Sequence, residues 1–111
     1  MDEGQRYRVT DLTAIAEPPE AGILSRTLHA DDGAKVVLFG FAEGEELSEH
    51  TSSRAATIHV LSGDIELTLD GERTDAGPGA WVHMAPGLPH ALRARAPSAM
   101  LLTLFTPAGA S

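Results

Sequence analysis

Short apolar segments separated by tight-turn signals run through most of this chain. The clearest is Asp64–Asp70, where apolar and polar residues swap at every step, a pattern typical of a half-buried strand. Asp70-Gly71 then predicts a hairpin turn into residues 72–74, because a glycine there can adopt a positive φ angle. Two nearly continuous apolar runs, at 36–39 and 101–105, indicate strands covered on both faces, since each is too short for a buried helix.

The same pattern predicts further strands, bounded by turns rich in glycine, proline and aspartate. Their ranges are 22–28, 35–41, 55–61, 80–84, 90–93 and 99–105. One helical turn is expected within residues 10–16, with Thr10 or Asp11 as its cap. Strands this short and this regularly spaced predict an all-β sandwich or barrel. We expect one domain over residues 1–111, with the barrel at about 22–105 and an N-terminal extension at 1–21.

Composition narrows the class of protein further. The 111 residues include 16 acidic and 8 basic ones, and the formal charge of −8 disfavours nucleic acid or an anionic membrane surface as a partner. The chain has no cysteine, which excludes disulfides, thiolate metal sites and a cysteine nucleophile. The polar N-terminal region reads as neither a signal peptide nor a membrane span, so a soluble, cytoplasmic protein is expected.

Two glycine-framed segments each carry a histidine at a defined distance. In the first, five residues separate Gly44 from His50, and Gly63 closes the segment. In the second, Gly79 is followed by five residues, then by the loop Ala-Pro-Gly-Leu-Pro and His90. In order and spacing both resemble the two sequence motifs of the cupin superfamily, and the chain looks most like the small single-domain bacterial cupins of the cupin-2 type. The resemblance covers about residues 22–105 and implies a cupin-type double-stranded β-helix, or jelly-roll barrel.

In that family three histidines and one glutamate hold a divalent metal inside the barrel. His50 and His90 stand at two of these ligand positions. Ser52 stands at the second histidine position, Ala56 at the glutamate position, and Ala94 at the asparagine position of the second motif. The resemblance therefore implies a depleted centre, in which Zn, Fe, Mn, Ni or Cu would need another ligand beside the two histidines.

His59 is the candidate for that third metal ligand, because it follows the empty glutamate position by three residues. Strict alternation from Ala56 turns His59 to the opposite face of its strand, whereas a β-bulge between Ser52 and Ala56 would turn it inward. Its other reading is a hydrogen-bonded residue on a sheet face or at a dimer interface. His29 is expected at a solvated strand end, and His83 is expected to point outward.

The remaining candidate side chains have two readings each. Arg54 lies within the first motif and could recognise a carboxylate, although a surface position is favoured. Trp81, Met84 and Met100 read as core in preference to pocket wall. The acidic run at 43–49 reads as a solvated loop before His50.

These features leave three functions open. The first is an enzyme in which His50 and His90 act on a small organic molecule, with a divalent metal or as general acid and base, in oxygenase, isomerase, lyase or cyclase chemistry. The second is a non-catalytic cupin that binds or senses a small molecule in a metal-free pocket. The third is a scaffold whose main role is dimerisation through edge strands. The expected partners are a small-molecule ligand and, in a homodimer, a second copy of the chain.

Overall fold

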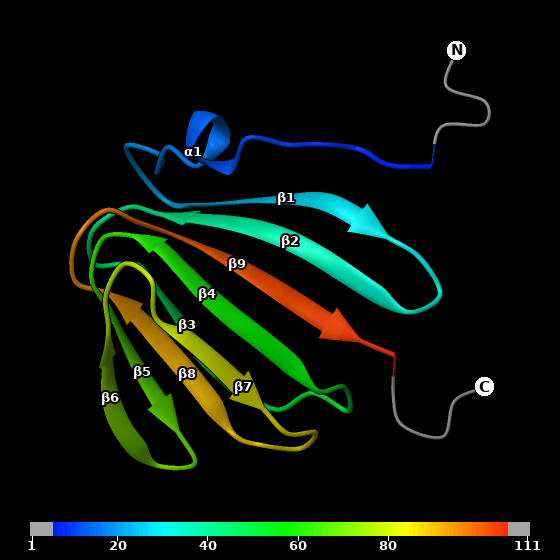
Figure 1. The fold of residues 1–111 in the computed structure, drawn as a ribbon. Coiled ribbons are helices and arrows are strands. Elements are labelled where there is room, and N and C mark those ends of the chain that lie inside the picture. The colour runs from blue at the N-terminus through cyan, green and yellow to red at the C-terminus, as the bar shows by residue number, and fades with distance from the viewer. Residues whose placement is uncertain (1–5, 107–111) are drawn as a thin grey trace.

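Residues 6–106 are described by the computed structural model, in which two antiparallel sheets pack against each other (Figure 1). One sheet has five strands in the order β1-β2-β9-β4-β7, and the other has four in the order β3-β8-β5-β6. The strands are β1 (Ile23–Ala30), β2 (Ala34–Phe41), β3 (Glu46–His50), β4 (Ala56–Ser62), β5 (Ile65–Leu69), β6 (Glu72–Ala76), β7 (Trp81–Met84), β8 (His90–Ala94) and β9 (Ser98–Phe105). This arrangement confirms the all-β jelly-roll fold.

Strands that are remote in the sequence lie side by side in both sheets. β2 pairs with β9 in continuous register from Ala34 opposite Phe105 to Phe41 opposite Ser98. β3, which ends at His50 of the first glycine-framed segment, pairs with β8, which begins at His90. The topology therefore brings the histidines of the two motifs onto neighbouring strands.

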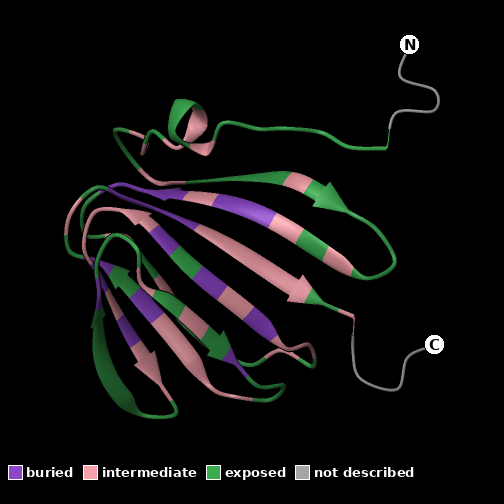
Figure 2. Cartoon of the chain, viewed as in Figure 1, coloured by how far each residue is buried: buried purple, intermediate pink, exposed green. Residues whose placement is uncertain are grey.

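β4 shows how the alternation of side chains builds the two faces of a sheet. Its residues Ala56, Ile58 and Val60 are 3%, 2% and 0% exposed and point into the barrel, whereas His59 between them is exposed. Figure 2 shows this change of burial class along the strand. The pattern follows from the pleat, because successive side chains of a strand point to opposite faces.

The core between the sheets is filled by side chains from both of them. Phe41, Val60 and Met100 come from the five-stranded sheet, and Ile65 and Leu67 from the four-stranded one, each at most 1% exposed. Burial of one such side chain stabilises the fold by roughly 1.5–3 kcal/mol. The same strands continue into the histidine region, so the core holds the site's framework in place.

The N-terminal extension contains the expected helical turn, α1 (Leu12–Ile15). Asp11 is its cap, since the Asp11 carboxylate accepts a hydrogen bond from the Thr13 amide at 3.1 Å. After the helix the chain passes so close to β2 that a side chain at Gly40 would meet Pro19 Cδ at 3.0 Å. Within residues 6–106 no helix is long and apolar enough to cross a membrane.

The acidic run before His50 is partly a strand, which corrects the expectation of a loop. Glu46–His50 form β3, and their acidic side chains are exposed as expected of solvated residues. The register of β3 against β8 shifts between Leu47 and His50, which marks a bulge or irregularity. This shift matters for the site because it changes which residues of β3 face the barrel interior.

Gly63 forms the tight turn between β4 and β5. Its φ angle is +91°, and a Cβ built there would overlap Ser98 Oγ and the Pro97 carbonyl oxygen. Ser98 is fully buried, and its hydroxyl accepts a hydrogen bond from the Asp64 amide at 3.0 Å. The glycine that closes the first motif is therefore needed both for its backbone angle and for the close approach of the 97–98 segment.

Candidate functional site

His50 and His90 meet across the pair of strands β3 and β8. Their Cα atoms are register partners, and their ring centroids lie 4.2 Å apart with an interplanar angle of 60°. Their proximity agrees with the resemblance to the cupin motifs, which places both histidines at one site. The two imidazoles form a contact pair, which we call the histidine pair.

The inward orientation of the pair has a local cause on each strand. On β8 it is simple alternation, because His90, Leu92 and Ala94 share a face, and Leu92 and Ala94 are buried. On β3 alternation alone would turn Leu47 and His50 to opposite faces, since they are three positions apart in the sequence. The register shift between them places both against one cavity.

Each ring of the pair is held by a backbone carbonyl two residues earlier. His50 Nδ1 lies 2.8 Å from the Ser48 carbonyl oxygen, and His90 Nδ1 lies 2.8 Å from the Leu88 carbonyl oxygen. A carbonyl oxygen only accepts, so Nδ1 is the donor and carries the hydrogen in both rings. In a neutral ring Nε2 then keeps its lone pair and is the nitrogen available to a ligand.

The histidine pair lies where two cavities adjoin. The inner cavity has a volume of about 90 Å³, and the outer one, which we call the mouth, has a volume of about 240 Å³. Both are lined by His50 and His90, together with Met84 and Leu102. The other side chains of the inner cavity are all apolar, namely Phe39, Leu47, Ile58, Leu67, Ala91, Leu92 and Met100.

Two polar side chains from the first motif line the mouth. They are Ser52 and Arg54, in the loop between β3 and β4, and they accompany apolar residues such as Leu88 and Leu104. Arg54 is half-buried. The reading of Arg54 as a surface residue therefore needs correction, because its side chain borders the same cavity as the histidine pair.

His59 lies away from the pair. The register of β4 is unbroken from Ala56 to His59 against β7, so strict alternation holds and turns His59 outward, opposite Trp81. His59 is exposed and does not line either cavity. The structure therefore does not bring together the three expected metal ligands, and His59 leaves the candidate set.

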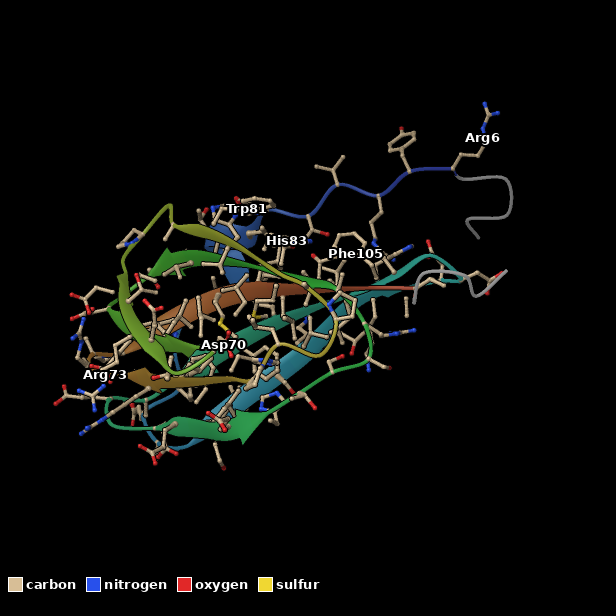
Figure 3. All side chains as sticks on the ribbon, turned by 90° about the horizontal axis from the view of Figure 1, so that it is seen from below. Arg6, Asp70, Arg73, Trp81, His83 and Phe105 are labelled. Carbon is tan, nitrogen blue, oxygen red and sulfur yellow. The ribbon has the colours of Figure 1, made fainter. Side chains whose placement is uncertain are left out.

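The outer face of the five-stranded sheet also carries Trp81 and His83. Trp81 is 64% exposed, which corrects its assignment to the core, and His83 is exposed as expected. Figure 3 shows both on β7, with Phe105 along the same side of the molecule and Arg73 on the opposite side. His29 lies at an exposed strand end, where its Nε2 contacts Asp31 Oδ2 at 2.7 Å.

The pKa shifts found in the described residues lie outside the cavities. The hydrogen bond to His29 lowers the pKa of Asp31 from 3.8 to about 2, with help from the amides of Gly33 and Ala34. Hydrogen bonds to Asp64 and Asp75 raise the pKa of Arg95. Asp31 stabilises the hairpin between β1 and β2, and Arg95 stabilises the 95–98 turn. Neither residue lines the cavities beside the histidine pair.

The histidine and carboxylate side chains of the described residues do not form a complete set of ligands for a divalent metal ion. Within residues 6–106 no group of three or more histidine, aspartate or glutamate side chains is placed to hold an ion. The histidine pair supplies two ligands, whereas a catalytic metal centre normally has three from the protein. The charged side chain among the described residues that line the mouth is the cationic Arg54, which repels a metal cation.

Two packed antiparallel sheets with a common core, and a cavity bordered by the exposed His50 and the half-buried His90, are typical of the double-stranded β-helix class of protein. The family model described as Cupin domain matches residues 37–106. The chain belongs to the cupin superfamily, in its cupin-2 group, as the two glycine-framed motifs indicated.

Solved structures with the same fold cover nearly the whole chain. A conserved protein of unknown function from Streptococcus pyogenes is 33% identical, with a TM-score of 0.82 over 93% of this chain and 90% of that one. A cupin superfamily protein from Desulfitobacterium hafniense is 26% identical, with a TM-score of 0.81 over 90% of this chain and 92% of that one. An RmlC-like cupin from Desulfovibrio desulfuricans is 26% identical, with a TM-score of 0.82 over 92% of this chain and 99% of that one. No curated protein matches the chain.

Several residues line the cavities although the sequence pattern does not assign them to a pocket. Arg54 and Ser52 lie in the stretch where the family carries its ligands, and that position was the signal that could have assigned them to the mouth. Met100 was assigned to the core and is 1% exposed, but it also forms a wall of the inner cavity. Nothing in the sequence indicates that Leu47 lines the inner cavity, because the orientation of its side chain depends on the register shift in β3.

Proposed function

We propose that this protein binds one small organic molecule in the barrel interior, with the histidine pair as its polar anchor. The observation that carries the proposal is the contact of the two imidazoles within an otherwise apolar cavity. Small-molecule sites generally have this form, a mainly apolar concave surface with a few convergent polar groups. The family alone supplies no reaction, since one fold serves many functions.

The histidine pair supports hydrogen bonding and proton transfer to the bound molecule. With Nδ1 tied to the backbone, a neutral ring offers the Nε2 lone pair, and a protonated ring offers an Nε2–H donor. One ring can accept a proton from the ligand and return it elsewhere, which is general acid–base chemistry. His50 and His90 are therefore the residues we assign to any reaction in this pocket.

The second candidate function is a metal-dependent enzyme of the oxygenase, isomerase, lyase or cyclase type. One observation favours it: a histidine that binds a metal usually donates its other ring N–H to a carbonyl or carboxylate, as both rings of the pair do. The remaining ligands would have to come from solvent or substrate, because the described residues supply no third one. We rank it below metal-free binding for that reason.

The first test is a titration of the protein with small probe molecules, followed through the NMR signals of the histidine rings. The panel pairs three carboxylates with their uncharged amides: isobutyrate and isobutyramide, benzoate and benzamide, hexanoate and hexanamide. We expect saturable shifts at His50 and His90 with members of the panel. The affinity for the probe, obtained from this titration, should fall by about tenfold or more in His90→Ala, because that variant loses one of the two polar anchors.

The matched control is His59→Ala, which removes a histidine from the outer face of the barrel and should leave the titration unchanged. The proposed function is overturned if no member of the panel gives a saturable shift. It is also overturned if His50→Ala and His90→Ala both bind as the unmodified protein does. Sedimentation of the same samples tests the homodimer, which stays a prediction.

A further inference from the structure

Arg54 is a cationic side chain at the mouth of the cavity, and no carboxylate of residues 6–106 forms an ion pair with it. Its half-buried side chain lines the mouth together with both rings of the histidine pair. The ion pairs within residues 6–106 involve His29 and Arg95, and none involves Arg54. A partly desolvated guanidinium presents several N–H donors in a fixed plane, which suits a carboxylate.

The loop that carries Arg54 is tied to the loop that precedes His90. The Ser52 carbonyl oxygen accepts a hydrogen bond from the Gly87 amide at 2.7 Å, and Ser52 Oγ accepts one from the Arg54 amide at 3.0 Å. At the far end of the same loop, the Ala55 carbonyl oxygen accepts from the Phe105 amide at 3.0 Å. These bonds hold the Arg54 backbone beside the mouth, so the loop needs little ordering when a ligand binds.

The charge of the cavity is opposite in sign to that of the protein. The chain has 16 acidic and 8 basic residues, yet no aspartate or glutamate is among the described residues that line the inner cavity and the mouth. The titratable groups there are His50, Arg54 and His90. A local absence of carboxylates around one guanidinium favours an anionic ligand over a cationic one.

We propose that the ligand of this cavity is a small carboxylate with an apolar body, and that Arg54 binds its carboxylate group. This inference rests on the proposed function, because it names the class of molecule that the histidine pair anchors. The carboxylate lies between Arg54 and the pair, and the apolar body enters the inner cavity. Arg54 thereby determines specificity for the anionic head group, and the inner cavity determines the shape of the body.

The size of the cavities limits that body. An apolar cavity of roughly 150 Å³ accommodates benzene. The inner cavity of about 90 Å³ is smaller and the mouth of about 240 Å³ is larger, and they adjoin at the histidine pair. The matching ligands are therefore acids with a single small ring or a short alkyl chain.

The experiment compares each carboxylate of the panel with its isosteric amide at constant ionic strength. In the unmodified protein at least one carboxylate should bind about tenfold more tightly than its amide, the usual scale for a charge-assisted pair. Arg54→Gln should bring the affinities for the two members of that pair to within about twofold of each other. Arg54→Lys keeps the charge but loses the planar fork, so it should restore only part of the preference.

Arg93→Gln is the matched control, because it removes the same charge from an exposed position on β8 that lines neither cavity. It should keep the preference for carboxylates. If the amides bind as tightly as the carboxylates in the unmodified protein, the inference fails and the proposed function stands. If neither series binds, both fail. If Arg93→Gln abolishes the preference as Arg54→Gln does, the effect is one of net charge and the inference is overturned.

Discussion

His50 and His90 contact each other across two strands, and each ring is fixed by the carbonyl oxygen two residues before it. The ring centroids are 4.2 Å apart, and both Nδ1 atoms lie 2.8 Å from their carbonyl oxygens. The same local contact on each strand therefore sets the same tautomer in both rings. This symmetry is what gives the pocket two Nε2 atoms that a ligand can reach.

The tautomer of the pair is the first prediction. At a pH where the rings are neutral, the nitrogen NMR shifts should report a protonated Nδ1 and an unprotonated Nε2 at both His50 and His90, because a carbonyl acceptor requires a donor. Long-range proton–nitrogen correlation spectra measure this directly. His59, which has no ring hydrogen bond within the described residues, serves as the comparison. A protonated Nε2 at either member of the pair contradicts the assignment.

The second prediction concerns metal content. Protein purified without a His-tag and dialysed should hold well under one divalent metal ion per chain, since two imidazoles beside a guanidinium are a weak site for a cation. Elemental analysis gives the ratio, with His50→Ala as the site variant and His59→Ala as the control. One metal ion per chain that disappears in His50→Ala would support the metal-dependent candidate instead.

The third prediction separates backbone strain from crowding at two glycines. Gly63 and Gly79 both have φ angles of +91°, but only at Gly63 would a Cβ overlap other atoms, and at Gly79 nothing lies within 4 Å. Gly79→Ala should cost about 1–2 kcal/mol from the left-handed backbone alone. Gly63→Ala should cost about 2–4 kcal/mol or prevent folding, because the 97–98 segment must also move. Urea unfolding measures both, and equal costs would show that crowding is unimportant.

The fourth prediction tests the wall of the inner cavity. Met100 is 1% exposed and lines that cavity, so Met100→Ala should lower the free energy of unfolding by about 2–5 kcal/mol. The neighbouring Leu101 points to the opposite face and is partly exposed, so Leu101→Ala should cost clearly less. Denaturant unfolding of the two variants gives the comparison. A larger loss in Leu101→Ala would mean that the faces of β9 are misassigned.

The fifth prediction is a pH effect at the hairpin between β1 and β2. The pKa of Asp31 is lowered to about 2, chiefly by its hydrogen bond to His29. A lowered pKa means that the carboxylate stabilises the folded state above pH 3.8 and loses that contribution as the pH falls through about 2. His29→Ala should raise the pKa of Asp31 towards 3.8, in a carbon NMR titration of the carboxylate. His83→Ala should not change it.

Much of the fold followed from local pattern. Alternation at Asp64–Asp70 and the turn at Asp70-Gly71 correctly predicted β5 and the hairpin into β6, because a strand that is buried on one face must alternate. β3 was missed, because its Glu46, Ser48 and Glu49 resemble a solvated loop. Its strand character comes from pairing with β8, whose partner residues lie 40 to 47 positions further along the chain, outside any local window.

The sequence by itself determined the all-β class and the turns, since these depend on local alternation and turn residues, and its resemblance to the two cupin motifs implied the cupin fold and a shared site for His50 and His90. Only the tertiary structure decided the content of the pocket. It turned His59 outward through the regular register of β4 from Ala56 to His59 against β7, and it brought Leu47 and His50 to one cavity through the register shift in β3. It also set Arg54 beside the pair through bonds between two loops. These outcomes depend on how strands and loops remote in sequence meet, and local composition does not encode that.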